Sequence, residues 1–190
     1  MTKGRMEAFS DGVIAIIITV MVLELKVPHE ATLEALRPAV PPLLTYALSF
    51  VYVGIYWNNH HHMLHAASRV NGAVLWANLH LLFWLSLVPF TTGWMGENHV
   101  APVPTAVYGV DLLLSAIAYY VLTQTILAAE GPGSQLGAAV GRDFKGRISA
   151  VLYLFAIPLA FVRAWLAVAI YVLVGLMWLI PDRRIERRVA

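Results

Sequence analysis

Six apolar stretches, each near the length that a lipid bilayer requires, constrain this chain more than any other feature. A helix needs about 20 mainly apolar residues to cross the hydrocarbon core of a membrane. Of the 190 residues, 59% are hydrophobic and 13% are charged, a balance that excludes an ordinary soluble domain. We therefore predict an all-α, six-transmembrane-helix bundle that forms a single domain, residues 1–190. The stretches lie at about residues 5–26, 39–60, 70–94, 103–128, 148–162 and 164–180.

The last two stretches are separated only by Arg163. The first of them then has about fifteen residues, which is short for a full crossing. One helix through both would run about 50 Å at 1.5 Å per residue. A tight helical hairpin at Arg163 is therefore the simpler interpretation.

The loops between the stretches differ in positive charge. One side of the predicted bundle carries ten Lys and Arg residues, and the other carries only Lys26, Arg37 and Arg163. Because positively charged loops stay in the cytoplasm, we predict that both termini are cytoplasmic. The ten residues are Lys3, Arg5, Arg69, Arg142, Lys145, Arg147, Arg183, Arg184, Arg187 and Arg188.

The first stretch has one face of mixed size and polarity. At 100° per residue, Ser10 and Asp11 point to other sides of the helix than this face. A packing face is the ordinary explanation for such a stripe, with a small residue allowing close approach. The stripe contains Arg5, Gly12, Ile16, Thr19, Leu23 and Lys26, with Val20 at its edge.

Ionisable side chains occur within the apolar stretches. Asp11 and Glu24 bracket twelve uncharged residues, about 19 Å of helix, so at least one carboxylate lies at or inside the bilayer boundary. At membrane depth an ionisable group is a functional-site hypothesis by default. A proton channel or transporter that uses Asp11, His80 and Asp111 is therefore one alternative, and a structural membrane protein is another.

Structural roles are the alternative to proton transfer for these polar residues. Trp76 and His80 share a face at a spacing of four, with Asn78 flanking. His80 is a candidate to hydrogen-bond Ser10 or Asp11 and so lock the first helix in place. For Asp111, a partner on a neighbouring helix is favoured over a proton site.

A run of histidines closes the second stretch. His61 and His65 share a face at a spacing that suits a metal ion, but no cysteine or carboxylate accompanies them. A polar helix end at the membrane interface is the favoured interpretation of His60–His62, and we predict no metal site.

The sequence lacks the usual features of enzymes and of nucleic-acid-binding proteins. The chain has no P-loop, HExxH or GxSxG motif, so we predict no catalytic residues and no cofactor. A net charge of +2 is too small to indicate nucleic acid as a partner.

The head of the first stretch resembles a family signature. Arg5-x-x-x-Phe9-Ser10-Asp11 is similar to the RxxxFSD motif of the transmembrane-protein-175 family, the lysosomal potassium leak channels and their bacterial single-repeat relatives. The similarity covers about the first hundred residues. It continues through GVIAIIITVMVLELKVP (12–28), Trp57–His62 and WANLHLLFWLSLVPFTTGWMGE (76–97).

The resemblance implies a potassium channel, weakly selective over sodium and of the leak type, in the inner membrane of a bacterium. It implies a homotetramer whose first helices line a central pore, with potassium ions, membrane lipid and further copies of the chain as partners. The constriction would fall on Ile16 and Leu23, and the other pore-lining positions on Gly12, Thr19 and Val20. Phe9, Ser10 and Asp11 would be structural, hydrogen-bonded within and between subunits to Arg5, Trp76, Asn78 or His80.

Such a pore needs no carbonyl filter. A narrow ring of four isoleucines excludes water and gates by dewetting. Potassium then passes more readily than sodium because it sheds water at lower cost, and a ring of Thr19 hydroxyls replaces some of that water.

Overall fold

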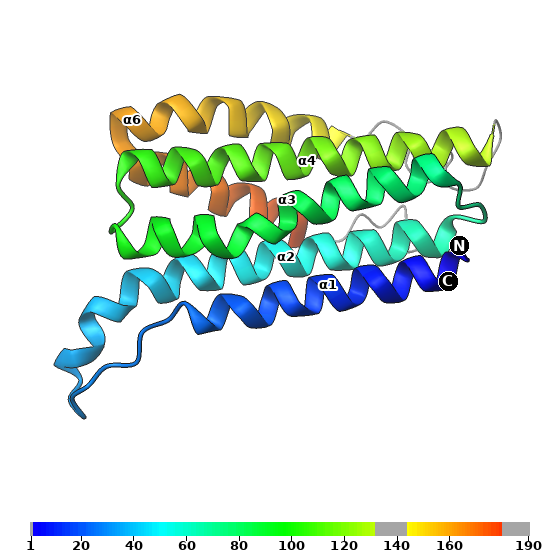
Figure 1. The fold of residues 1–190 in the computed structure, drawn as a ribbon. Helices are drawn as coiled ribbons and strands as arrows, with labels where there is room; N and C mark the ends of the chain where they lie inside the picture. The colour runs from blue at the N-terminus through cyan, green and yellow to red at the C-terminus, as the bar shows by residue number, and fades with distance from the viewer. Residues whose placement is uncertain (1, 132–143, 180–190) are drawn as a thin grey trace.

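Long helices packed side by side make up the structure (Figure 1). It is a computed structural model that describes residues 2–131 and 144–179. Five of its helical segments are long and apolar enough to cross a membrane, by length and composition. The helices are α1 (Lys3–Leu23), α2 (Val40–Ala66), α3 (Gly72–Glu97), α4 (Pro102–Glu130) and α6 (Phe144–Leu179), and the 3-10 helix η1 (Glu34–Ala39) leads into α2.

The predicted bounds of the first four helices agree with the observed ones to within three residues, except at the end of α2. There α2 continues to Ala66 and not to residue 60, because His60, Met63 and Leu64 are all buried against neighbouring helices. The prediction of a polar helix end is therefore wrong for His60, which is buried, whereas His61 is exposed and His62 is half-buried.

The last two apolar stretches form a single element, α6, with a break at Arg163. The backbone of Arg163 is extended, with φ −154° and ψ 100°, and interrupts the helix there. The two parts fold back on each other, since Trp178 Nε1 donates to Ser149 Oγ at 2.9 Å and Lys145 Nζ donates to the carbonyl of Met177 at 3.3 Å. The arginine between two apolar runs thus marks the turn of a hairpin.

Polar contacts fasten both ends of the bundle. At one end Lys3 Nζ donates to the carbonyl of His65 at 2.8 Å, and the Glu130 carboxylate accepts from the backbone N–H of Arg69 at 2.8 Å. At the other end Lys26 Nζ lies 2.7 Å from Glu97 Oε1. The hydrogen bond to Glu97 and the charge of Glu97 raise the pKa of Lys26.

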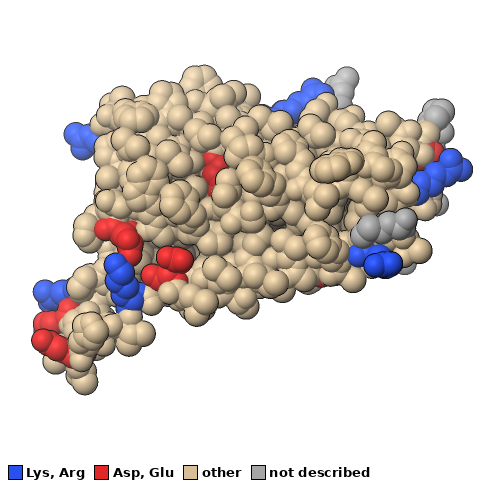
Figure 2. Space-filling model, viewed as in Figure 1, with Lys and Arg blue, Asp and Glu red and all other residues tan. Residues whose placement is uncertain are grey.

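Charged side chains gather toward these two ends, and a broad, mainly uncharged band lies between them (Figure 2). A band of this kind suits a bilayer core, where a charge is costly. Half of the ten positive residues used to predict orientation lie outside the described residues, namely Arg142, Arg183, Arg184, Arg187 and Arg188.

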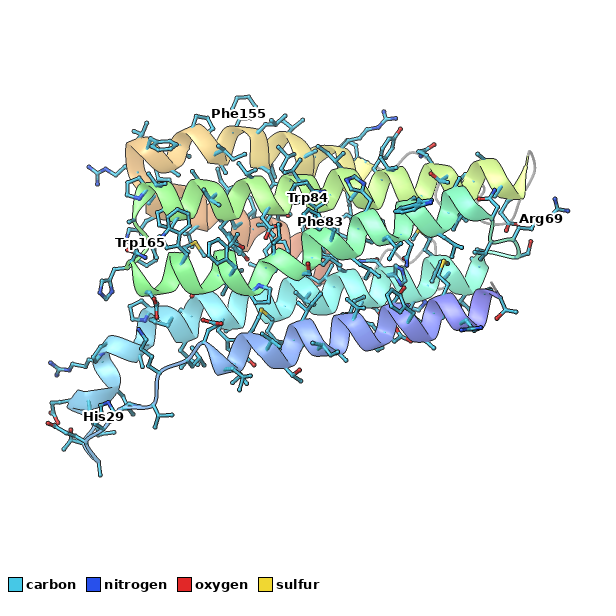
Figure 3. The ribbon with its side chains drawn as sticks, viewed as in Figure 1. His29, Arg69, Phe83, Trp84, Phe155 and Trp165 are labelled. Atoms are coloured by element: carbon cyan, nitrogen blue, oxygen red, sulfur yellow. The ribbon has the colours of Figure 1, made fainter. Side chains whose placement is uncertain are left out.

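Two apolar clusters hold the helices together. The first contains Met6, Ile14 and Ile17 of α1 together with residues of α2, α3 and α4, and the second packs α4 and α6 around Tyr108 and Tyr171. Large apolar side chains also cover the outside. Phe155 and Trp165 of α6 are 67% and 63% exposed, and Phe155 points away from the bundle (Figure 3), as lipid-facing residues do.

Candidate functional site: the outer face of α1 and the network behind it

Helix α1 has one buried face and one exposed face. Its buried residues recur every three or four positions and pack against α2 and α3; they are Met6, Ser10, Ile14, Ile17 and Met21. The opposite face stays exposed along most of the helix. It carries Gly12, Ile16 (62% exposed), Thr19, Val20 and Leu23 (78% exposed), the residues that the sequence predicted to line a pore.

The exposed face of α1 carries one hydroxyl group, that of Thr19, between large apolar side chains. Thr19 Oγ1 donates to the backbone carbonyls of Ala15 and Ile16, both at 3.0 Å. Because its proton is used on the backbone, the oxygen presents its lone pairs as an acceptor. Ile16 and Leu23 lie about one turn to either side, and a Cβ added at Gly12 would meet no atom within 4 Å. The face therefore combines apolar bulk, an acceptor and open space.

A buried chain of hydrogen bonds fixes the other side of α1. Asn78 Nδ2 donates to Ser10 Oγ at 2.9 Å, and Ser10 Oγ donates to the carbonyl of Met6 at 2.9 Å. Asn78 Oδ1 lies 2.7 Å from His60 Nε2, and since this oxygen only accepts, His60 Nε2 is the donor. The three side chains are at most 2% exposed. They join α1, α2 and α3 and set the rotation of α1 about its axis.

A second bond joins α1 to α2 at the surface. Trp57 Nε1 donates to Asp11 Oδ1 at 3.0 Å. The Trp57 ring stacks on His61, and His61 stacks on His65, with centroids 6.2 Å apart in both pairs. Asp11 thus has a partner on a neighbouring helix, although its side chain is exposed.

Asp111 lies in a different part of the bundle. It is 3% exposed and its Oδ2 accepts from Thr91 Oγ1 of α3 at 2.9 Å, so its partner is on a neighbouring helix, as the sequence favoured. Its Oδ1 and the hydroxyl of Ser115 are buried without a hydrogen-bond partner. Asp111 therefore belongs to the contact between α3 and α4.

Comparisons with known proteins support the sequence resemblance. The model of the family described as "Endosomal/lysosomal potassium channel TMEM175" matches residues 5–89. A protein named potassium channel from Chryseobacterium sp. (strain P1-3) is 54% identical over 187 residues, 98% of this chain and 97% of that relative. The chain belongs to the TMEM175 family.

A solved structure and a vertebrate protein are also similar to this TMEM175-family chain. The crystal structure of a lysosomal potassium-selective channel TMEM175 homolog from Chamaesiphon minutus matches it with a TM-score of 0.79 at 31% identity, covering 99% of this chain and 98% of that one. The endosomal/lysosomal proton channel TMEM175 of Gallus gallus is 41% identical over 73 residues, 32% of this chain and 15% of that protein. The family is one of ion channels and not of enzymes, and the chain is a multi-pass membrane protein.

In this TMEM175-family chain, only part of the expected motif network forms within one subunit. Ser10 bonds Asn78 and Asp11 bonds Trp57, whereas His80 accepts from Trp84 of its own helix at 3.0 Å. His80 contacts neither motif residue because it lies two positions from Asn78, about 200° around α3. The remaining members expected from the family motif are exposed: Arg5, Phe9 and Trp76.

The sequence interpretation missed His60, the end of the buried chain. Its position contained a signal, since Val53, His60 and Leu64 are spaced by seven and four residues and share one apolar stripe of α2. Within the described residues no group of three or more His, Asp or Glu side chains is placed to hold a metal ion.

The three groups of the proton-relay alternative have separate partners. Asp11 bonds Trp57, His80 bonds Trp84 and Asp111 bonds Thr91. Across residues 2–131 and 144–179, no side-chain hydrogen bond joins one of these carboxylates to the imidazole. A relay through all three would need steps outside these contacts.

Proposed function

We propose that this chain is the subunit of a potassium-selective, leak-type cation channel in which the exposed face of α1 lines the pore. The observation that supports this most strongly is the exposure of Gly12, Ile16, Thr19 and Leu23 on a helix whose opposite face is buried. The Thr19 oxygen on this face can accept from water or coordinate an ion, since its proton is donated to the backbone. Its relative from Chryseobacterium is named a potassium channel, and the similar solved structure is described as potassium-selective.

The pore requires several copies, and we propose a homotetramer with α1 of each subunit at the axis. Each subunit crosses the membrane six times, because the two parts of α6 on either side of Arg163 form a hairpin. An even number of crossings places both termini on the same side, and the excess of Lys and Arg in the loops on that side makes it the cytoplasmic one. The exposed Arg5, Phe9 and Trp76 are available for contacts with the neighbouring subunit and with lipid.

Ile16 and Leu23 form the constriction in this proposal. A ring of branched apolar side chains excludes water when it is narrow, so the pore closes by dewetting. Gly12, Thr19 and Val20 line the wider parts, and the Thr19 oxygen offers an acceptor to a partly dehydrated ion. Selectivity for potassium over sodium is then weaker than that of a carbonyl filter.

The test is potassium flux from liposomes with an imposed potassium gradient. Replacing Ile16 by Asn wets the ring and removes the dewetting barrier, so flux through Ile16→Asn rises and selectivity falls. Leu23→Ala acts in the same direction with a smaller effect. The matched control is Leu154→Asn on α6, since Leu154 is 58% exposed and Ile16 is 62% exposed.

Unchanged flux in a well-folded Ile16→Asn protein would contradict the assignment of Ile16. An equal rise in Leu154→Asn would show that a polar group anywhere on the outer surface makes the membrane leak.

Proton conduction is the second candidate, because the vertebrate relative from Gallus gallus is named a proton channel. It predicts acidification that follows a pH gradient when potassium is symmetrical, read with a pH-sensitive dye in the same liposomes. Asp11→Asn, His80→Gln and Asp111→Asn would each abolish it if the relay operates.

A further inference from the structure

A cavity of about 240 Å³ lies between α2, α4 and α6, away from the exposed face of α1. Aromatic side chains form much of its wall: Tyr52 and Tyr56 from α2, Tyr119 and Tyr120 from α4, and Tyr153 and Trp178 from α6. Small residues leave the space open between these rings, since Ala116, Gly146 and Ala150 also line it.

The wall of the cavity offers little to water. At about 30 Å³ for each water molecule, the space would hold about eight, and each would need two or more polar partners. Three of its polar side chains are engaged with other protein groups: the Tyr52 hydroxyl donates to the carbonyl of Tyr171 at 2.6 Å, Tyr153 donates to Tyr52 at 3.1 Å, and Trp178 donates to Ser149. A hydrocarbon chain fits such a lining better than water does.

A positive charge stands at the edge of this cavity. Arg147 lines it, has an exposed side chain and, within the described residues, makes no ion pair with an acidic group. Its neighbour Lys145 is engaged with the carbonyl of Met177 and lies 5.8 Å from the centre of the Trp178 ring. A guanidinium of this kind can bind an anion bidentately.

The position of Arg147 along α6 matches the level of lipid headgroups. Sixteen residues separate Arg147 from Arg163, about 24 Å at 1.5 Å per residue. The hydrocarbon core of a bilayer is about 30 Å thick, so the two arginines lie near opposite membrane interfaces. An anion held by Arg147 at that level can extend an attached hydrocarbon chain into the adjacent cavity.

We propose that the cavity binds an acyl chain of an anionic phospholipid whose phosphate pairs with Arg147. The occupant follows from an aromatic, carbon-lined space and, at the proposed headgroup depth, an arginine that has no acidic partner among the residues that the structure describes. The bound lipid connects α2, α4 and α6 at a level where they line the cavity together. This binding does not rest on the proposed potassium conduction, because it is measurable on the purified protein without any ion flux.

The experiment measures thermal unfolding of the purified protein in detergent with increasing phosphatidylglycerol or phosphatidylcholine. A ligand that binds only the folded state raises the unfolding temperature. We expect phosphatidylglycerol to raise it at lower concentration than phosphatidylcholine does. In Arg147→Gln the half-saturating concentration of phosphatidylglycerol rises about fivefold, the effect of one basic residue near an anionic surface. Arg163→Gln, on the same helix at the other interface, is the matched control and leaves the response unchanged.

A second variant tests the cavity itself. Ala150→Leu fills the space while Arg147 stays, so the response to phosphatidylglycerol is lost although the protein without lipid unfolds at the same or a higher temperature. The proposal is overturned if both lipids act equally on all variants. It is also overturned if Ala150→Leu changes the oligomeric size and leaves the lipid response intact, because the space would then belong to a contact between copies.

Discussion

At the scale of single residues, the hydroxyl of Ser10 connects α1 to the rest of the subunit. It accepts from Asn78, which in turn accepts from His60, so three helices share one chain of donors. Every polar atom in this chain is buried, and an unpaired buried donor costs the full loss of its hydration. Ser10 of the family motif is therefore a buried contact between helices, whereas Phe9 and Asp11 of the same motif are exposed.

Removing the Ser10 hydroxyl tests this lock. Ser10→Ala leaves Asn78 Nδ2 without its acceptor, so the free energy of unfolding falls by about 1–3 kcal/mol. Ser86→Ala on α3 is the matched control, because Ser86 is exposed and donates only to the carbonyl of Phe83. Denaturant titrations in detergent compare the two; equal stability of both variants would show that the Asn78 bond contributes little.

Thr19 is the second residue with a separable role. Thr19→Val keeps the branched shape and removes the oxygen that faces the proposed pore, so the potassium-to-sodium permeability ratio falls while conduction persists. Thr125→Val serves as control, since the Thr125 hydroxyl is also exposed and donates to a carbonyl of its own helix. The ratio is read from reversal potentials with potassium and sodium on opposite sides. If it is the same in wild type and Thr19→Val, Thr19 only fills space.

At the scale of elements, α4 and α6 approach closely at Gly109. A Cβ there would meet the Tyr171 hydroxyl and would lie 3.1 Å from Ile157 Cγ1. Tyr171 cannot move away without loss, because its hydroxyl donates to the carbonyl of Thr105 at 3.1 Å. This glycine lets the hairpin of α6 pack on α4.

Gly109→Ala should destabilise the protein by about 1–3 kcal/mol through overpacking. Gly54→Ala provides the comparison, since Gly54 also lies inside a helix but has no atom within 4 Å of an added Cβ. Its better helix propensity makes Gly54→Ala neutral or more stable by up to about 1 kcal/mol. The measurement is thermal unfolding of the two proteins in the same detergent. A Gly109→Ala protein as stable as Gly54→Ala would mean that α4 and α6 move apart at this contact without loss of stability.

The sequence predicted features that depend on one helix alone, and it did not predict contacts between helices. Hydropathy located the spans because a bilayer core dictates their length, and the 100° rule separated the exposed Ile16 face from Ser10 because both belong to one helix. The partners of Ser10 lie on other helices, at separations that no local pattern encodes. His60 was misread because its polar neighbours dominate the local composition, while burial follows its spacing from Val53 and Leu64.

At the scale of the whole molecule, the helices of one subunit leave one face of α1, the proposed pore lining, exposed. Its other helices expose large apolar residues that suit lipid, such as Phe155 and Trp165, and the exposed face of α1 carries Gly12 and Thr19 among its apolar residues. In the proposed channel, this face of α1 borders a water-filled axis between several copies. The absence of cysteine from the sequence makes the axis directly testable, because any introduced thiol is unique.

The most direct test of the pore is modification of Thr19→Cys by a positively charged, water-soluble thiol reagent during potassium flux from liposomes. Thiols react as thiolates and therefore only where water reaches them. If α1 lines the pore, the reagent blocks flux through Thr19→Cys, excess potassium slows the block, and Leu154→Cys on the lipid-facing side of α6 is unaffected. Flux through Thr19→Cys that resists the reagent, together with block of Leu154→Cys, would contradict a pore lined by α1.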